Sequence, residues 1–204
     1  GMIGKVMALD ISKRHDLHLS DLDRSALKEI KALDPTIKTR CFNVNDSDML
    51  KSFLKPADIV LLAVPGHMGY ELLEKIIDFK KNIVDISFTP ENILSLDKKA
   101  KDNNITIIFD AGLAPGIPNF LLGKIDSTEN VKNFKYFVGG LPKHPEPPYN
   151  YKAPFSPIDV VEEYTRPARI MRNGEIVTRP ALTDIEEKIY PGIGLLEGFN
   201  TDGL

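Results

Sequence analysis

The chain has 204 residues, of which 42% are hydrophobic, and this is enough to bury a core in one or two domains. Its formal net charge of -3 argues against nucleic acid or an acidic membrane as a partner, because both need clustered positive charge. Cys41 is the only cysteine, so a disulfide framework within the chain is excluded and a cytoplasmic location is expected. No apolar run approaches the roughly 20 residues of a membrane span. The four histidines lack the spacing of metal ligands, so no metal is expected.

The opening Gly1-Met2-Ile3-Gly4 runs into apolar residues with helical spacing. It resembles the latter part of a phosphate-binding turn, in which a helix that begins near Met2 faces the pyrophosphate of a dinucleotide. Such a turn follows a strand, so the first strand of this fold would be missing from the sequence. The alternative is that Gly1-Met2 is left over from a cleaved expression tag, and that Gly4 is a small residue within a helix.

Asp21 favours the first interpretation. It follows Gly1 by 20 residues and ends a strand expected near the start of residues 16–23. Dinucleotide-binding domains carry an acid at about this spacing, which accepts hydrogen bonds from the ribose hydroxyls. The predicted cofactor residues here are Gly1, Met2, Ile3, Gly4 and Asp21. NAD is favoured over NADP, because a carboxylate repels a 2′-phosphate. Alternatively, Asp21 and Asp23 cap the helix expected over residues 24–33.

Strands and helices alternate along the next part of the chain. After the helix at 24–33, helices are predicted over 47–54 (with Ser47 as N-cap), 69–79 and 91–103, and strands within 39–45, 57–65, 82–87 and 105–112. The apolar run 57–65 predicts a central strand that is buried on both faces. This order indicates an α/β fold with a Rossmann-type, doubly wound parallel sheet, which binds ligands at the carboxyl ends of its strands.

The later part of the chain has a different pattern. A helix is predicted to begin at 120–125, a strand over 133–142, and a hairpin with a type I′ turn at Asn173-Gly174. The proline-rich stretch 141–157 is either a surface connector or a loop that lines the substrate cleft.

Six motifs in order carry a family resemblance: AVPG (63–66), VDISFTPE (84–91), DAGLAPG (110–116), GGLP (139–142), EEYTRPA (162–168) and NTDGL (200–204). Together they resemble the saccharopine dehydrogenase-like family and, within it, the lysine 6-dehydrogenase branch. The resemblance runs essentially from end to end. It implies an N-terminally incomplete NAD-binding Rossmann domain over 1–115. It also implies a C-terminally incomplete α/β domain over 116–204, with a mostly antiparallel sheet that covers the substrate and forms a homodimer.

The implied reaction is the NAD-dependent oxidation of an amino acid's side-chain amine, with L-lysine as the expected substrate. One alternative is another member of the family, such as a saccharopine or carboxynorspermidine dehydrogenase. Another is a non-catalytic, NAD-sensing module. Saccharopine-forming relatives carry an acid at the position of Ala114 in GLAPG, and its absence weakens saccharopine as the substrate.

The remaining site residues follow from the strand ends and the motifs. Ala63, Val64, Pro65 and Ser87 are expected to border the nicotinamide, and Asn43 and Val44 the adenine. Asp110, Asp85 and Lys81 are the candidates for proton transfer, although Asp85 and Asp110 could equally bond backbone groups at loop turns. Glu162, Glu163, Tyr164 and Arg166 are suited to hold the ammonium and carboxylate of an amino acid, and a solvated strand face is the alternative. Thr201 and Asp202 match the family's TDG segment near the cleft.

Overall fold

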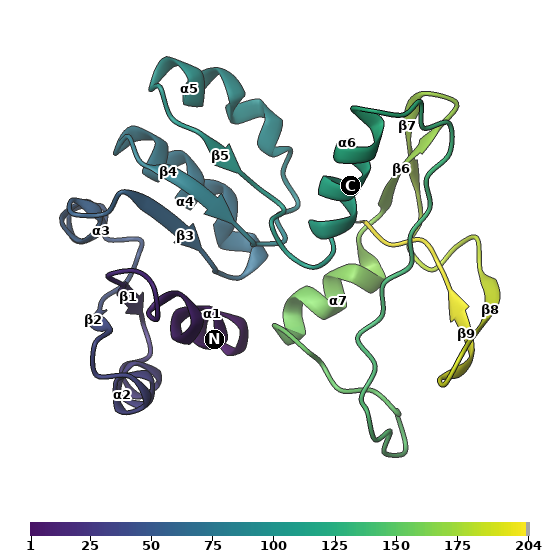
Figure 1. Ribbon diagram of the computed structural model, residues 1–204, viewed down its shortest axis with the longest axis horizontal. Coiled ribbons are helices and arrows are strands. Elements are labelled where there is room, and N and C mark those ends of the chain that lie inside the picture. The colour runs from purple at the N-terminus through teal and green to yellow at the C-terminus, as the bar shows by residue number, and fades with distance from the viewer. Residues whose placement is uncertain (203–204) are drawn as a thin grey trace. The chain divides into compact units, whose positions relative to one another are not determined.

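The computed structural model describes residues 1–202, and the chain divides after Gly112 into two compact units (Figure 1). The family resemblance implies a boundary near this division. The first unit contains α1 (Met2–Ile11), β1 (His18–Asp21), α2 (Arg24–Leu33), β2 (Lys38–Cys41), α3 (Ser47–Leu54), β3 (Ile59–Leu62), α4 (Gly66–Asp78), β4 (Asn82–Asp85), the 3₁₀ helix η1 (Ile93–Leu96), α5 (Asp97–Asp102) and β5 (Ile107–Ile108). The expected alternation of strands and helices is confirmed.

The strands of the first unit form two parallel sheets, β1-β2 and β3-β4-β5. Their registers pair Asp21 with Cys41 and Leu62 with Asp85, so the carboxyl ends of neighbouring strands lie together. Within residues 1–202, β1 and β3 each pair with a single strand. In the doubly wound strand order the first strand lies between these two positions. The two parallel sheets agree with the expected doubly wound fold.

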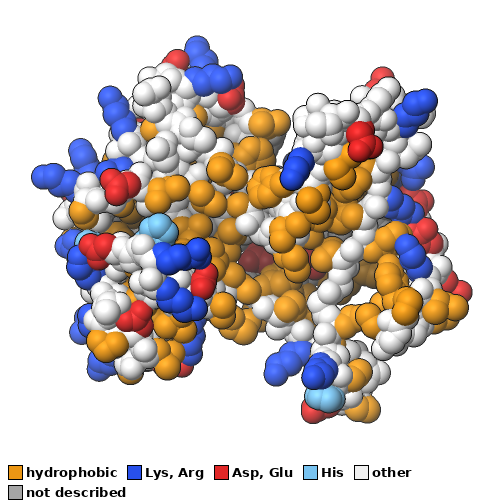
Figure 2. Space-filling model, in the orientation of Figure 1, with side chains coloured by type: hydrophobic (Ala, Val, Ile, Leu, Met, Phe, Trp, Pro, Cys, Tyr) orange, Lys and Arg blue, Asp and Glu red, His pale blue; other side chains and the backbone are white. Residues whose placement is uncertain are grey.

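Strand β3 corrects one prediction. Val60 and Leu62 are buried against α4, but Ile59 is 60% exposed and Leu61 is 36% exposed. The strand therefore buries only one face, and its apolar composition did not reveal this. Figure 2 shows hydrophobic side chains at the surface over this part of the molecule.

Aspartate side chains cap two helices of the first unit, α2 and α3. Asp23 caps α2 by accepting hydrogen bonds from the backbone N–H groups of Ser25 at 2.7 Å and Ala26 at 3.3 Å. Helix α3 is capped by Asp46, which accepts from the Met49 N–H at 3.0 Å. The prediction of Ser47 as its N-cap is wrong, because Ser47 is already the first helical residue.

The second unit contains α6 (Ile117–Asp126), α7 (Pro157–Thr165) and the antiparallel pairs β6 (Ala168–Arg172) with β7 (Glu175–Arg179) and β8 (Glu186–Tyr190) with β9 (Gly194–Gly198). Asn173 and Gly174 join β6 to β7 with φ values of 53° and 81°, which confirms the type I′ turn. The strand predicted over 133–142 is not formed, since this stretch pairs with no strand among the described residues. Over residues 1–202, no helix is both long and apolar enough to cross a membrane.

Candidate functional site

The start of α1 lies beside the acid at the end of β1. The amino nitrogen of Gly1 is 3.4 Å from one carboxylate oxygen of Asp21, and the other oxygen accepts from the Asp23 N–H at 2.9 Å. Asp23, rather than Asp21, supplies the cap of α2. Of the two interpretations of this pair, the structure therefore assigns capping to Asp23 and places Asp21 at the start of α1.

The same helix also lies near the third strand. A Cβ on Gly4 would lie 4.0 Å from the Cβ of Ala63, which follows β3. Helix α1 thus reaches the carboxyl end of β3. A helix N-terminus with a nearby acid fits the pyrophosphate and ribose of a dinucleotide.

Asp85 ends β4 and is the most deeply buried acid of the first unit, at 1% exposure. Its Oδ1 accepts hydrogen bonds from the Ser87 N–H at 2.9 Å and from the Ser87 hydroxyl at 2.7 Å. The hydroxyl also lies 2.7 Å from Oδ2. Burial raises the pKa of Asp85 from 3.8 to about 6, the bonds from Ser87 oppose the rise, and the charge of Asp110 adds to it.

These contacts change the roles predicted for Asp85 and Ser87. Both carboxylate oxygens of Asp85 face Ser87, so its bonds hold a loop turn, which is the alternative considered for this residue. Ser87 itself is buried, and its hydroxyl is engaged with Asp85. It can shape the edge of the nicotinamide position, but its side chain is not presented to a ligand.

Asp110 lies at the carboxyl end of β5, close enough to Asp85 for its charge to act there. It is partly exposed and has a φ of 49°, a conformation that costs a non-glycine residue about 1–2 kcal/mol. Strain of this kind is frequent at functional sites. Of the three candidates for proton transfer, Asp110 has the most suitable position.

Lys81 lies at the opposite end of the sheet. It directly precedes β4, and its ammonium donates hydrogen bonds to the carbonyl oxygens of Lys55 at 3.0 Å and Ala57 at 2.6 Å. Ligands bind at the carboxyl ends of parallel strands, whereas Lys81 closes a loop at the amino end. This corrects its selection as a candidate for proton transfer.

The other predicted cofactor residues have mainly structural contacts. Asn43 uses its side-chain oxygen to accept from the Asn45 N–H at 3.0 Å, and Val44 packs against the core. Val64 also packs against the core, while Pro65 forms the N-terminal boundary of α4. Asn43 is therefore a turn former here, and its contact with an adenine stays a prediction.

In the second unit, the predicted substrate residues bond one another. Arg166 is 10% exposed and donates to a carboxylate oxygen of Glu162 at 3.3 Å and 3.2 Å, and its guanidinium lies 3.9 Å from Asp202. Glu162 belongs to α7, Arg166 directly follows that helix, and Asp202 follows β9, so none of the three lies on a strand face. The guanidinium is paired within the protein, and its use by a substrate stays a prediction.

Arg169 is a residue that the sequence reasoning missed. Its Nε and NH2 groups form two bonds to the carboxylate of Asp202, at 2.8 Å and 2.9 Å, and its backbone N–H adds a third at 3.1 Å. The two residues are 33 positions apart, so no local pattern links them. Asp202 is buried at 3% exposure and joins the end of the described chain to β6. Thr201, beside it, is partly exposed.

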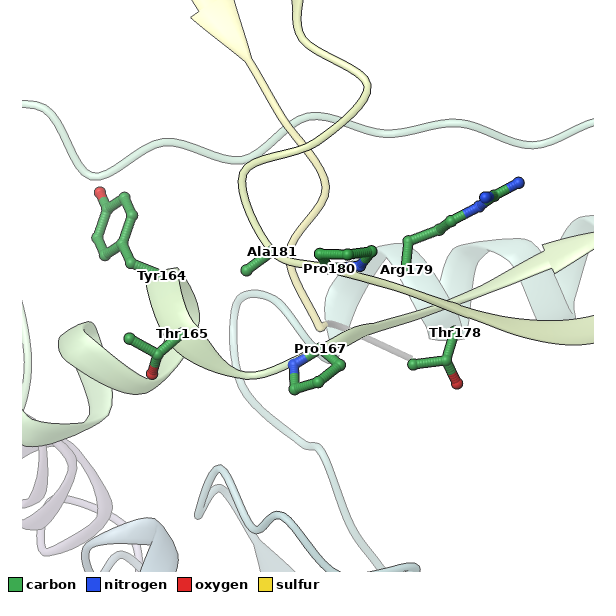
Figure 3. Close-up of a pocket in the computed structure, with 7 residues that line it drawn as sticks. All are labelled: Tyr164, Thr165, Pro167, Thr178, Arg179, Pro180 and Ala181. Carbon is green, nitrogen blue, oxygen red and sulfur yellow. The ribbon is translucent and has the colours of Figure 1, made fainter.

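Glu163 and Tyr164 have different neighbours from Arg166 and Asp202. Burial raises the pKa of Glu163, and the charge of Asp159, one turn earlier in α7, raises it further. The Tyr164 ring lies 5.6 Å from that of Phe199. A pocket of about 410 Å³ is lined by Tyr164, Thr165, Pro167, Thr178, Arg179, Pro180 and Ala181 (Figure 3). Tyr164 is the one predicted substrate residue that lines it.

The parallel strands and the acid beside the start of α1 agree with a Rossmann-type dinucleotide-binding unit over residues 1–112. The family models agree. The "Saccharopine dehydrogenase NADP binding domain" matches residues 1–108, and the "Saccharopine dehydrogenase C-terminal domain" matches residues 112–204. The chain belongs to the saccharopine dehydrogenase family.

Individual relatives are more distant. Alpha-aminoadipic semialdehyde synthase of Rattus norvegicus is 28% identical over 163 residues, which is 76% of this chain and 18% of the rat protein. The saccharopine dehydrogenase [NADP(+), L-glutamate-forming] of Pyricularia oryzae is 28% identical over 78% of this chain and 38% of its own. The structure of saccharopine dehydrogenase (L-Glu forming) from Saccharomyces cerevisiae has the same fold, with a TM-score of 0.68 at 20% identity over 99% of this chain and 48% of that chain. The chain spans less than half the length of each.

Proposed function

We propose that the protein is an NAD-dependent oxidoreductase that oxidises the side-chain amine of an amino acid, with L-lysine as the first candidate substrate. The observation that carries the proposal is the carboxylate of Asp21, 3.4 Å from the nitrogen at the start of α1. Membership of the saccharopine dehydrogenase family supports the class of reaction, which takes place at a carbon–nitrogen bond.

The preference for NAD rests on charge. The P. oryzae relative is named for NADP(+), and so is the family model of this domain. Asp21 would accept hydrogen bonds from ribose hydroxyls, but its negative charge would repel a phosphate at the 2′ position. The N–H of Asp23 holds the carboxylate in place and leaves one oxygen directed to the start of α1.

A bound nicotinamide would accept the hydride from the carbon that bears the amine. The protein must then keep that amine neutral, so that its lone pair can form the C=N bond, and must accept the proton that is released. Asp110, at the carboxyl end of β5, is the proposed acceptor. Water would hydrolyse the imine to an aldehyde and ammonia.

The choice of lysine rests on two residues. Ala114 stands where saccharopine-forming relatives carry an acid, and this disfavours saccharopine. Arg166 is paired with Glu162, but Glu162 is 45% exposed, so a substrate carboxylate can replace it at little cost. Saccharopine is the second candidate, because two of the relatives above are named saccharopine dehydrogenases.

The test is an assay of the full-length protein at 340 nm with NAD or NADP and a panel of lysine, ornithine, saccharopine and carboxynorspermidine. The proposal predicts NADH formation with lysine, release of ammonia and little activity with NADP. Activity with saccharopine and none with lysine would favour the second candidate. Equal rates with both cofactors would refute the role of Asp21.

We also propose a homodimer formed through the second unit. Its hairpin β8-β9 exposes Ile189, Ile193 and Leu195 at 75%, 64% and 59%, and Figure 2 shows hydrophobic side chains over these strands. Apolar patches of this kind mark protein interfaces. Light scattering during size-exclusion chromatography should give twice the mass of a single chain. The cytoplasmic location stays a prediction.

A further inference from the structure

Three neighbouring loops meet at the carboxyl ends of β3, β4 and β5. The loop after β4 bonds Asp85 through Ser87, and the loop after β5 bonds it through the Ala111 N–H, which donates to the Asp85 carbonyl oxygen at 2.9 Å. The Ile86 N–H donates to the Leu62 carbonyl at 3.1 Å, which ties the same segment to the end of β3. The segment from Asp85 to Ser87 therefore joins these strand ends, and Asp85 supplies its bonds to Ser87 and Ala111.

Helix α4 closes this arrangement through Gly69. A Cβ on Gly69 would lie 2.3 Å from the Ser87 hydroxyl oxygen and 2.2 Å from the Thr89 Cγ2. Both distances are shorter than any real contact, so the Ser87 hydroxyl occupies space that exists because residue 69 is glycine. The loop is thus held from two sides, by the Asp85 carboxylate and by the bare backbone of α4.

A buried aspartate is an expensive way to hold a loop. An asparagine has nearly the same shape and would avoid the desolvation of a charge. The carboxylate does offer stronger bonds, because hydrogen bonds to an ionised acceptor are about twice as strong as neutral ones. Burial also raises the pKa of Asp85, as expected for a charge held in an unfavourable environment.

We propose that Asp85 is a positioning residue: its carboxylate holds the Ser87 loop in the shape that receives the nicotinamide end of the cofactor, at a cost to the stability of the protein. The cofactor part of this inference rests on the proposed function. Asp85 touches neither substrate nor cofactor, and it acts through Ser87.

The test compares Asp85→Asn with the wild type, and uses Gly123→Ala as a control, because a Cβ on Gly123 in α6 meets no atom within 4 Å. Asp85→Asn should raise the melting temperature at pH 8, and yet should speed hydrogen exchange of the Ser87 amide and weaken NAD binding, each about tenfold. Gly123→Ala should leave exchange and binding unchanged. A merely structural residue would not combine higher stability with weaker binding.

The outcomes separate this proposal from the proposed function. Unchanged exchange at Ser87 in Asp85→Asn would overturn the positioning role, and so would a loss of stability together with faster exchange throughout the first unit. If the wild type binds no dinucleotide, the proposed function fails, and the exchange comparison still decides whether Asp85 holds the loop. Ser87→Ala removes the hydroxyl bonds to Asp85 but keeps the bond from the backbone N–H of residue 87 to Oδ1. Asp85→Asn should therefore still speed exchange of this amide in the Ser87→Ala background.

Discussion

Gly69 offers the sharpest test of the packing described above. In Gly69→Ala, the new methyl would lie 2.2 Å from the Thr89 Cγ2, 2.3 Å from the Ser87 Oγ and 3.1 Å from the Ser87 Cβ. Thr89 and Ser87 are both buried, so neither side chain can swing out into solvent. The loop after β4 or the helix α4 must shift. Gly123→Ala is the matched control, since it places the same methyl in a helix where nothing lies within 4 Å.

The expected magnitudes have opposite signs. Alanine is better than glycine in a helix by about 0.5–1 kcal/mol, so Gly123→Ala should be slightly stabilising. At Gly69 the same gain is opposed by overpacking, which costs about 1–3 kcal/mol in a packed core. The free energies of unfolding of the two variants should therefore differ by about 1–3 kcal/mol, with Gly69→Ala the less stable.

Urea denaturation at a constant m-value measures this difference. Thr89→Ser removes the Cγ2 methyl, and in the Gly69→Ala background it should restore part of the lost stability. Equal midpoints for Gly69→Ala and Gly123→Ala would refute the close approach of α4 to the Ser87 loop. A lower midpoint without any recovery from Thr89→Ser would refute Thr89 as the clashing group.

Three further predictions concern charged residues. Asp21→Ala should weaken NAD binding by about 1–3 kcal/mol, the cost of leaving hydrogen-bonding groups unpaired, and should narrow the preference for NAD over NADP; calorimetry with both cofactors measures this. Arg169→Ala should lower the free energy of unfolding, measured by urea denaturation, more than Asp202→Ala does. Removing Arg169 leaves the Asp202 carboxylate, which is 2% exposed, without its bidentate partner, whereas Arg169 is 35% exposed and can be hydrated when Asp202 is removed. The raised pKa of Asp85 gives stability that is fully present below about pH 4 and is lost as the pH rises through about 6. The loss is about 3 kcal/mol, and Asp85→Asn should abolish this part of the pH profile of thermal unfolding.

The sequence predicted those features that depend on local chemistry. The alternation of strand and helix follows from hydrophobic periodicity, and the hairpin at Asn173-Gly174 follows from the positive φ values that these residues tolerate. The spacing from Gly1 to Asp21 also had a physical basis, because one strand and one helix separate the two positions in a nucleotide-binding unit. The structure brings them to 3.4 Å.

Features that depend on distant partners could not be predicted. The apolar run of β3 is compatible with burial on one face or on both, and only the neighbouring elements decide. Asp202 was selected from a motif, but its bonds to Arg169 join residues 33 positions apart. Lys81 was selected for its residue type near a strand. Its position at the amino end of β4 became decisive only when its bonds to the carbonyls of Lys55 and Ala57 were known.

The distribution of costly features within the first unit supports the location of the site. Near the carboxyl ends of β3, β4 and β5 lie a buried carboxylate at Asp85, a positive φ of 49° at Asp110 and a glycine within a helix at Gly69. Each is less favourable than a simple alternative: a neutral residue, a glycine at the strained position, or an alanine in the helix. At the amino ends of β4 and β5, Lys80 and Asn104 also have positive φ values, of 55° and 54°, so the φ of Asp110 does not by itself mark the site. Sequences depart from the most stable choice where function requires it. The buried carboxylate of Asp85 and the helix glycine packed against Ser87 are therefore the features that favour the carboxyl edge of this sheet as the proposed site.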